Sequence, residues 1–386
     1  MNYFICHYSE IGLKRKNRAF FEKKLIFNIK EIIGRENINR IYKNISTIII
    51  ETEKSENFIS EKLKKVYGLA NFAPSLKTEI DINKIKDVSL QVIKDKKLKT
   101  FKVETIKSYK NINLSSHDIN CAVGDYILKN TKNKKVNLDS PDITIFIEIL
   151  KDEVFIYTQK IKCYGGLPVS TSGKVAVMIS GGIDSPVASS LMQKRGAKCI
   201  FVHFHAYPYT SKSSIEKVER LVKILTEYQI DSKLYLVPFG DIQKEIILTV
   251  PTKFRVLFYR RVMVKITQEI AKKENCLGIV TGDSLGQVAS QTLESMFCVH
   301  NGIKLPIFRP LIGFNKEETI KLSKELNLYE ISILPYEDCC SRFVPQNPAI
   351  RPDIKEFLEC EKRLNISKII KDALKKVEIR NFNLNK

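Results

Sequence analysis

The sequence predicts an α/β protein whose C-terminal half forms a doubly wound parallel sheet and whose N-terminal half forms two small α+β domains. From residue 174 onward, short apolar runs alternate with amphipathic stretches of helical period, which is typical of a parallel sheet with crossover helices. Before residue 165, strand-like runs and short helices alternate in a basic region. A loop of turn-forming residues, 164–173, separates the two halves and is expected to be a linker.

The first half divides into domains that we place at 1–60 and 61–165. Apolar side chains at helical spacing predict an amphipathic helix near the N-terminus. They are Phe20, Phe21, Leu25, Ile26 and Ile29. The expected strands of this half are 3–7, 45–51, 101–104, 143–149 and 153–159, and the expected helices are 18–33, 57–66, 88–95 and 117–130.

The second half, 166–386, contains the repeated strand–helix pattern. Its strands are short and almost wholly apolar, because helices are expected to cover both faces of the sheet. The expected strands are 174–179, 198–204, 233–237 and 277–281, and the expected helices are 187–195, 214–228 and 255–273. The tail from Lys362 onward is basic, and we expect it to be helical.

Charge is the most unusual bulk property of the chain. Its 386 residues carry 64 Lys and Arg against 43 Asp and Glu, a formal net charge of +21. A field of that sign favours a polyanion such as nucleic acid. The alternative is compositional drift, because the chain is rich in Lys, Ile and Asn, as chains encoded by AT-rich genes tend to be.

The cysteines and the absence of targeting patterns indicate which classes of site and which cellular compartment are expected. The nine cysteines are odd in number and scattered, which is not a disulfide framework, and none forms a C-x-x-C pair. No cysteine or histidine spacing predicts a zinc or iron–sulfur site. The sequence has no signal-peptide pattern and no apolar run long enough to span a bilayer, so a cytoplasmic protein without membrane contact is expected.

The stretch Ser180 to Ala188, SGGIDSPVA, is the most informative local pattern. It follows an apolar strand, turns on two glycines and enters a helix, with Ser185 expected as the cap and Pro186 as the first helical residue. Such a turn directs backbone N–H groups and a helix N-terminus at one spot, which suits phosphate. No Lys follows as in a Walker loop. The S-G-G-x-D-S pattern resembles the PP-loop of ATP pyrophosphatases; the alternative is an ordinary strand-to-helix turn.

Two further stretches are expected at the same edge of the sheet, because ligands bind beyond the C-terminal ends of parallel strands. His203 and Phe204 end one strand, and Thr281 to Gln287 follow another. Arg260 and Arg261 lie on the preceding helix and could reach a phosphate. Taken alone, His203 is better explained as a core histidine, and the two arginines as a solvated face.

Over essentially its whole length the chain resembles the tRNA 4-thiouridine synthetases, also called tRNA sulfurtransferases. The matching motifs follow in the family's order. They are Tyr8–Lys14 with Asn17 and Arg18, Val66–Phe72 at the junction into a THUMP RNA-binding domain, Gly165–Pro168, the PP-loop, His203 with Phe204, Thr281–Thr292 (T-G-D-S-L-G-Q-V-A-S-Q-T) and Asp338–Cys340. The resemblance implies an N-terminal ferredoxin-like domain, a THUMP domain and a PP-loop domain.

The resemblance also implies the site residues. ATP would be held by Met178, Ile179, Ser180, Gly181, Gly182, Ser185, His203, Phe204, Arg260, Gly282 and Gln291. The residues implied in catalysis are Asp184, Lys316, Cys339 and Cys340. Asp184 would support pyrophosphate through Mg²⁺, and Lys316 suits the triphosphate or the RNA. Arg342 lies close in sequence and would lower a thiol pKa.

Three departures from the family pattern are visible. The THUMP stretch Glu104–Asn111 is less basic than usual, and Cys163 and Ser170 stand where the linker often has Gly. Many relatives continue into a rhodanese-like domain with a persulfide cysteine, and we expect none here. Cys339 sits at the family's spacing from Lys316, with Cys340 directly beside it; two structural cysteines are the alternative.

The implied function is ATP-dependent sulfur transfer to uridine 8 of tRNA through an adenylated uridine, with release of pyrophosphate and AMP. The expected partners are tRNA, a persulfide donor such as a cysteine desulfurase or free sulfide, and a second copy of the chain as a homodimer. A sulfur-carrier protein used in thiamine thiazole synthesis is a further acceptor. Two alternatives stay open: a PP-loop enzyme acting only on a carrier protein or small molecule, and a non-catalytic RNA-binding module.

Overall fold

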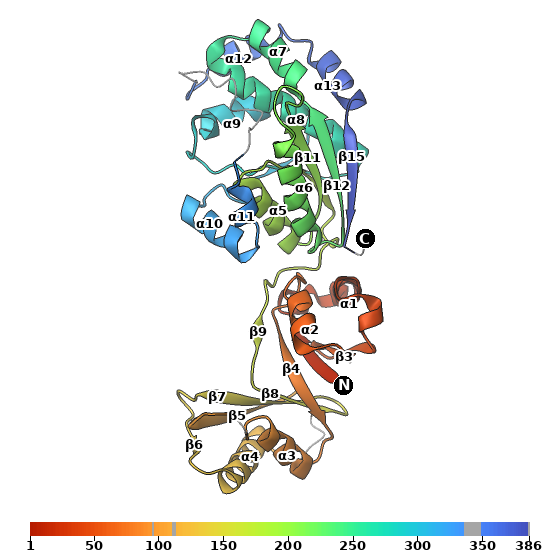
Figure 1. The fold of residues 1–386 in the computed structure, drawn as a ribbon, viewed down its shortest axis with the longest axis vertical. Helices are drawn as coiled ribbons and strands as arrows, with labels where there is room; N and C mark the ends of the chain where they lie inside the picture. The colour runs from red at the N-terminus through yellow and green to blue at the C-terminus, as the bar shows by residue number, and fades with distance from the viewer. Residues whose placement is uncertain (95, 110–112, 336–348, 385–386) are drawn as a thin grey trace. The chain divides into compact units, whose positions relative to one another are not determined.

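The computed structural model describes residues 1–94, 96–109, 113–335 and 349–384 (Figure 1). The chain divides into two compact units, Met1–Pro168 and Val169–Lys386. Each unit has its own sheet, and within the described residues the first sheet has nine strands and the second has six. No helix within the described ranges is long and apolar enough to cross a bilayer.

The sheet of the first unit has the strand order β2-β3-β1-β4-β8-β7-β5-β6, and β9 pairs with β4 beside this row. Its strands are β1 (Asn2–His7), β2 (Arg40–Asn44), β3 (Thr47–Thr52), β4 (Asn71–Thr78), β5 (Thr100–Lys107), β6 (Lys135–Val136), β7 (Ile143–Ile149), β8 (Val154–Tyr157) and β9 (Ile161–Lys162). The α-helices of this unit are α1 (Arg18–Ile33), α2 (Glu56–Leu63), α3 (Ile82–Gln91) and α4 (Ser116–Asn130). The first part of β4 pairs with β1 and its last part with β8, so one strand joins the two α+β layers.

Helix α1 begins and ends where its apolar period predicts, but its buried face is shifted. Leu25 and Ile29 are buried as expected, together with Ile32 and Ile33. Phe20, which we expected in the core, is exposed and meets Phe21 edge to face at 5.4 Å between ring centroids. The first turn therefore presents an aromatic side chain to solvent beside the basic residues that precede the helix.

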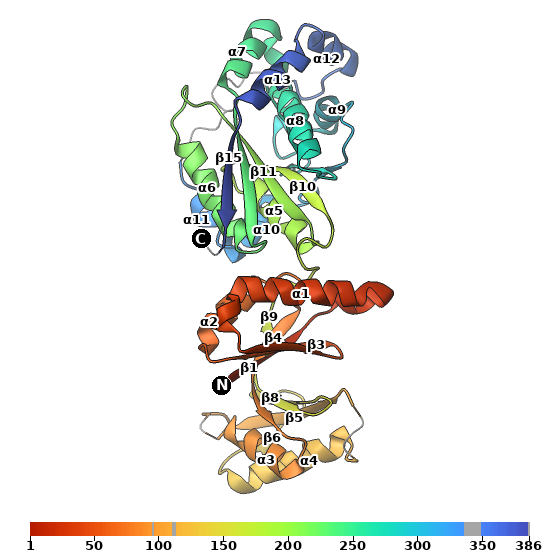
Figure 2. The same cartoon turned by 90° about the vertical axis from the view of Figure 1, so that its right-hand side faces the viewer.

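The sheet of the second unit has the strand order β14-β13-β10-β11-β12-β15. Figure 2 shows three of its strands, β10, β11 and β15. The strands of this sheet are β10 (Lys174–Met178), β11 (Lys198–His205), β12 (Asp231–Pro238), β13 (Ile279–Val280), β14 (Ile307–Phe308) and β15 (Glu378–Asn383). The α-helices of this unit are α5 (Asp184–Lys194), α6 (Ser213–Thr226), α7 (Gly240–Thr249), α8 (Arg255–Lys273), α9 (Leu293–His300), α10 (Lys316–Glu325), α11 (Tyr329–Ser332), α12 (Ile354–Glu361) and α13 (Ile366–Lys375). Helices α5 and α6 cover one face, and α8 with α13 covers the other, so the doubly wound α/β prediction is confirmed.

The C-terminal tail corrects one prediction. We expected a helical tail, and α13 is helical, but the chain then forms β15, which pairs antiparallel with β12. The strand EIRNFN places Ile379 opposite Tyr235 and Phe382 opposite Ser232. An antiparallel edge strand on a parallel sheet is a common ending for this architecture. The sheet is therefore mixed rather than wholly parallel.

Candidate functional site

The glycine-rich loop connects β10 to α5 and is braced by two serines. The Ser180 backbone N–H donates to Ser185 Oγ at 2.8 Å, and the two hydroxyls lie 3.0 Å apart. The helix begins at Asp184, with Ile183 as its N-cap and no side-chain cap, so the expected capping role of Ser185 is wrong. Ser185 lies inside the first helical turn, where its hydroxyl reaches back to the start of the loop. The loop residues Gly181 and Gly182 are thereby held between a strand end and a helix N-terminus, a geometry that binds phosphate.

Gly282 follows β13 and lies against the start of α5. A Cβ at this position would lie 2.7 Å from the Ser185 nitrogen and 2.9 Å from the Ser185 Cα. Real Cβ atoms do not approach backbone so closely, so only glycine allows the two loops to meet. The turn after β13 is therefore part of the same site as the loop after β10.

Replacing Gly282 with alanine should separate these two loops. We expect a loss of about 1–3 kcal/mol in the free energy of unfolding, the usual cost of overpacking, and a fall in ATP affinity of at least about tenfold. Gly313→Ala is the matched control, because a Cβ there meets no heavy atom within 4 Å. Thermal unfolding and titration with ATP measure both effects, and an ATP affinity equal to the parent's in Gly282→Ala would contradict the shared site.

Asp184 and Lys316 meet at the mouth of the loop. Lys316 Nζ lies 2.8 and 3.0 Å from the two carboxylate oxygens of Asp184, although the two residues are 132 positions apart in the chain. Gln287 Nε2 donates to Asp184 Oδ2 at 3.1 Å. Lys316 is the first residue of α10, which Asn315 and Glu318 cap reciprocally. The structure thus brings together two of the four residues implied in catalysis, Asp184 and Lys316, and adds Gln287 as a further partner of Asp184.

Asp283 organises a second cluster beside the glycine loop. Its carboxylate accepts from Arg260 Nη2, from Thr281 Oγ1 at 2.8 Å and from Gln291 Nε2 at 3.3 Å. Burial raises the pKa of Asp283, but Arg260 and the Thr281 hydroxyl outweigh it and hold that pKa below its usual range. Arg260 also donates to the Ser290 carbonyl at 2.5 Å. Arg260 and Gln291 are therefore fixed by Asp283, whose role the sequence reasoning did not assign.

The ends of strands β10 and β11 carry the other residues that we expected to bind the nucleotide. His203 is buried, and its Nδ1 lies 3.0 Å from the Ile179 carbonyl oxygen. The Ile179 N–H donates to the Val202 carbonyl at 2.9 Å, so its backbone edge is already paired inside the sheet. Phe204 is buried and packs edge-on against Phe239, with ring centroids 5.5 Å apart. Met178 is partly buried against the same core.

Arg261 is buried and therefore does not lie on a solvated face, the explanation that its sequence position alone favoured. Its side chain is 3% exposed and forms an ion pair with Glu361 at 2.8 Å. It also donates to the Cys298 carbonyl at 3.1 Å and the Val299 carbonyl at 3.2 Å. Burial opposes ionisation of Glu361, but Arg261 and Lys265 hold the pKa of that carboxyl below its usual range. Arg261 therefore ties α8 to α9 and α12, while its neighbour Arg260 faces the site.

Only some of the cysteines lie in the residues that the structure describes. Cys339 and Cys340 lie outside the described residues, as does Arg342. Burial raises the pKa of the Cys199 thiol and also that of Cys276, to about 11, so both thiols stay protonated in the core. Cys121 is exposed on α4.

A magnesium ion fits the site through one carboxylate. The Asp184 side chain is 22% exposed and lies at the mouth of the phosphate loop. Mg²⁺ usually keeps several waters and binds through one or two carboxylates and substrate phosphates, which this arrangement can supply. In the described part of the chain, no group of three or more His, Cys, Asp or Glu side chains gathers into a metal centre.

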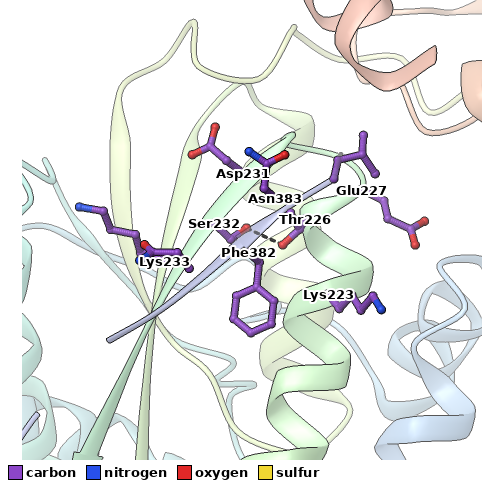
Figure 3. A pocket seen from close by; sticks show the side chains of 10 residues that line it. Lys223, Thr226, Glu227, Asp231, Ser232, Lys233, Phe382 and Asn383 are labelled. Atoms are coloured by element: carbon purple, nitrogen blue, oxygen red, sulfur yellow. Dashed lines mark hydrogen bonds between the residues drawn. The ribbon is translucent and has the colours of Figure 1, made fainter. Parts of the chain in front are cut away.

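A cavity of about 700 Å³ lies elsewhere in the second unit, beside β15 (Figure 3). Its labelled residues include Lys223, Lys233 and Phe382, and the Thr226 hydroxyl donates to Ser232 Oγ at 2.7 Å. It adjoins the first residues of β12, whereas the glycine loop follows the last residue of β10, so the two lie at opposite ends of the parallel strands. Lys233 is already paired with Glu274. This cavity is no part of the nucleotide site.

The first unit offers a basic surface before α1. Residues Lys14, Arg15 and Lys16 lie in a short 3-10 segment, Glu10–Asn17, and Arg15 has a positive φ of 43°. Lys14 Nζ lies 5.0 Å from the centroid of the Phe21 ring. Phe20, the neighbour of Phe21, is exposed, and adjacent cations next to an exposed aromatic ring are features that bind nucleic acid.

Known proteins are similar to this chain over 95% to 99% of its length. The family described as thiamine biosynthesis protein (ThiI) matches residues 170–366, the THUMP domain 79–159 and the ThiI ferredoxin-like domain 3–73. A probable tRNA sulfurtransferase of Thermoanaerobacter pseudethanolicus is 41% identical over 95% of this chain and 97% of its own. One from Brevibacillus brevis is 36% identical over 98% and 96%. A crystal structure of a 4-thiouridine synthetase with RNA and bound ATP matches with a TM-score of 0.92 and 35% identity, covering 99% of this chain and all of that one.

The fold and the loop define a PP-loop protein that carries ferredoxin-like and THUMP domains ahead of its nucleotide site. The extent of the similarity then decides the particular family. The chain belongs to the tRNA sulfurtransferases, a family of transferase enzymes.

Proposed function

We propose that this chain uses ATP to transfer sulfur to uridine 8 of tRNA and so forms 4-thiouridine. The observation that carries the proposal is the meeting of Asp184, Lys316 and Gln287 over the glycine loop. The similar 4-thiouridine synthetase, solved with RNA and ATP, supports both ligands. A tRNA substrate is the reason to expect the protein in the cytoplasm.

The proposed chemistry begins with the oxygen on C4 of the uracil ring. This oxygen attacks the α-phosphate of ATP, a P–O bond to pyrophosphate breaks, and an adenylated uridine forms. Sulfur then attacks C4, and AMP departs with the original oxygen. The backbone N–H groups of the loop and the Lys316 ammonium stabilise the charge that grows on the phosphate, and stabilisation of this kind usually dominates the catalysis of phosphoryl chemistry. Mg²⁺ held by Asp184 would supply further charge neutralisation.

Arg260 reaches this site as a fixed group. Because Asp283 and the Ser290 carbonyl hold its guanidinium, it loses little side-chain freedom when nucleotide binds. Asp283 partly neutralises the charge of Arg260. The field of Arg260 at the phosphate is therefore weaker than that of Lys316, once Lys316 has exchanged its pairing with Asp184 for the nucleotide. We therefore assign Arg260 to nucleotide binding and Lys316 to the reacting phosphate.

The sulfur source and the assembly belong to the same proposal. We expect a cysteine desulfurase or another persulfide donor to supply sulfur through Cys339 or Cys340, with free sulfide as the alternative route. A sulfur-carrier protein is a second acceptor, in keeping with the family description as a thiamine biosynthesis protein. A homodimer is expected from the family resemblance.

The test is nucleoside mass spectrometry of tRNA after incubation with the full chain, ATP and sulfide. Formation of 4-thiouridine that requires ATP supports the proposal. Pyrophosphate release that is the same with and without tRNA, and no thiouridine, would favour an enzyme acting on a carrier protein. Absence of pyrophosphate release under all conditions would favour a non-catalytic RNA-binding module.

Binding of tRNA should depend on the basic segment before α1. Replacing Lys14, Arg15 and Lys16 together with alanine should weaken binding by the full chain and reduce the slope of log affinity against log salt by about 2, because each phosphate contact contributes about 0.7–0.9. The control is the triple alanine variant of Lys368, Lys371 and Lys375 on α13, which are all exposed. Filter binding from low to high salt measures both slopes, and an unchanged slope in the first variant would remove this segment from the RNA surface.

A further inference from the structure

An exposed apolar groove lies between α9 and the residues after β14. It encloses about 620 Å³, within the range of pockets that hold one small ligand. Its lining residues are Leu293, Met296, Phe297, His300, Asn301, Arg309 and Ile312. The Phe297 ring is 60% exposed and Leu293 is 67% exposed, so the groove leaves apolar surface in contact with water. Solvent-exposed apolar surface gathered around a hollow commonly marks a binding site.

The groove adjoins the nucleotide site along the edge of the sheet. Strand β14 pairs in parallel with β13, which pairs with β10, so the residues after β14 emerge at the same edge as the glycine loop. The Thr281 N–H donates to the Phe308 carbonyl at 3.1 Å, and the Leu285 N–H donates to the Ile312 carbonyl at 3.1 Å. The chain that follows Gly282 is therefore bonded directly to the wall of the groove.

Arg309 links the groove to the nucleotide residues. Its Nε lies 3.8 Å from Asp283 Oδ2, and the same carboxylate holds Arg260. On its other side Arg309 Nη2 donates to His300 Nδ1. Burial, together with Arg309 and Arg260, lowers the pKa of His300 to about 3, so the imidazole is neutral and accepts this bond. Two guanidinium groups face one carboxylate, which leaves this end of the groove positive.

We propose that the groove between α9 and the residues after β14 receives an unpaired uridine of the RNA substrate, its base against Phe297 and its oxygens toward Arg309. This inference rests on the proposed function, because the acceptor uridine must reach a nucleotide bound at the glycine loop. An exposed aromatic ring is the usual platform for an unstacked base, and a guanidinium supplies donors to base carbonyl or phosphate oxygens. The acceptor base is thus placed on the β14 side of the nucleotide, opposite His203 and Phe204 on β11.

The groove is matched to a nucleotide rather than to a protein surface. Its volume is that of one small ligand, and a buried cluster of charge closes one end. The net charge of +21 complements an RNA strand. A second copy of this chain carries the same positive charge, so self-association through this groove would be opposed by repulsion.

The experiment uses the full chain and a tRNA transcript with 4-thiouridine at position 8, irradiated in the near ultraviolet and mapped by mass spectrometry. We expect a crosslink within residues 293–312. Phe297→Ala should lower the crosslink yield and the kcat/KM for unmodified tRNA by about 5- to 100-fold, the usual effect of losing one base–aromatic stack, while ATP affinity stays within about twofold. Phe297→Tyr should retain the parent's values, because it keeps the ring.

Leu248→Ala is the matched control, since Leu248 is 88% exposed on α7 and lines no part of the groove. A crosslink elsewhere, or a Phe297→Ala variant as active as the parent, would overturn the assignment. So would a loss of activity that accompanies a change from dimer to monomer in native mass spectrometry, which would make the groove an interface between copies. If the parent chain forms no thiouridine at all, the proposed function fails first, and that result is distinct from these.

Discussion

Asp184→Asn should lose most tRNA thiolation, by about 100- to 1,000-fold, while its thermal unfolding stays close to the parent's. The substitution keeps the shape of the side chain and removes only its charge. Asp184 sits at the first residue of α5, and its carboxylate is partly exposed, so the fold does not depend on it. The loss is expected in kcat, because the carboxylate would hold Mg²⁺ against the phosphates.

The same variant separates two roles of the carboxylate. Removing a negative charge beside a phosphate site should leave binding of metal-free ATP unchanged or tighter, whereas stimulation of binding by Mg²⁺ should disappear. Isothermal titration with ATP in EDTA and in Mg²⁺ measures both. Asp231→Asn is the control, because Asp231 also pairs with a lysine, Lys198 at 2.5 Å, at the far end of the strands. Near-parental turnover in Asp184→Asn would exclude the assigned role.

Replacing both Cys339 and Cys340 with serine should abolish thiolation from a persulfide donor while ATP-dependent adenylation continues. In the proposed route a donor loads one cysteine with a persulfide, whose terminal sulfur attacks C4 and displaces AMP. The neighbouring thiol then attacks the inner sulfur, releases the thiouridine and leaves a disulfide between the two cysteines. An external thiol must return two electrons before the next turnover.

The decisive measurement compares thiouridine formation from a desulfurase and cysteine with formation from free sulfide. At least one single variant, Cys339→Ser or Cys340→Ser, should fail with the desulfurase, and high sulfide should partly restore it by bypassing the thiol. Cys121→Ser controls for loss of an exposed thiol. A double variant as active as the parent with the desulfurase would mean that both cysteines are structural.

The bounds of long periodic segments could be predicted from the sequence, because the spacing of their apolar residues along the chain defines them. The helices 18–33 and 255–273 and the strand 143–149 have the predicted bounds. The strand β14 was not predicted, because it has only two residues and its pairing with β13 is what makes it a strand. Helix α3 begins at Ile82, earlier than expected, because Asp81 caps it by accepting from the N–H groups of Asn83 and Lys84.

The candidate site also has one part that the sequence predicted and another part that only the tertiary structure shows. A glycine-rich turn with Asp184 is a local pattern, and the sequence alone located it. The partnership of Asp184 with Gln287 and Lys316 joins three distant segments, and nothing in their local sequence specifies it. Arg260 and Arg261 are adjacent and identical in type, yet one faces the site and the other is buried against Glu361.

By itself the sequence determined the fold class, the position of the phosphate loop and the family, because each depends on the order of short motifs along the chain. Only the tertiary structure decided which groups meet. Gly282 reaches α5 because no Cβ intervenes, and Arg309 reaches Asp283 because β14 lies beside β13. Both contacts lie at the edge where the parallel strands end, and the sequence already predicted that edge for the turn after β13. The placement of β13 directly beside β10, and of β14 beside β13, is set by strand pairing and does not follow from their order along the chain.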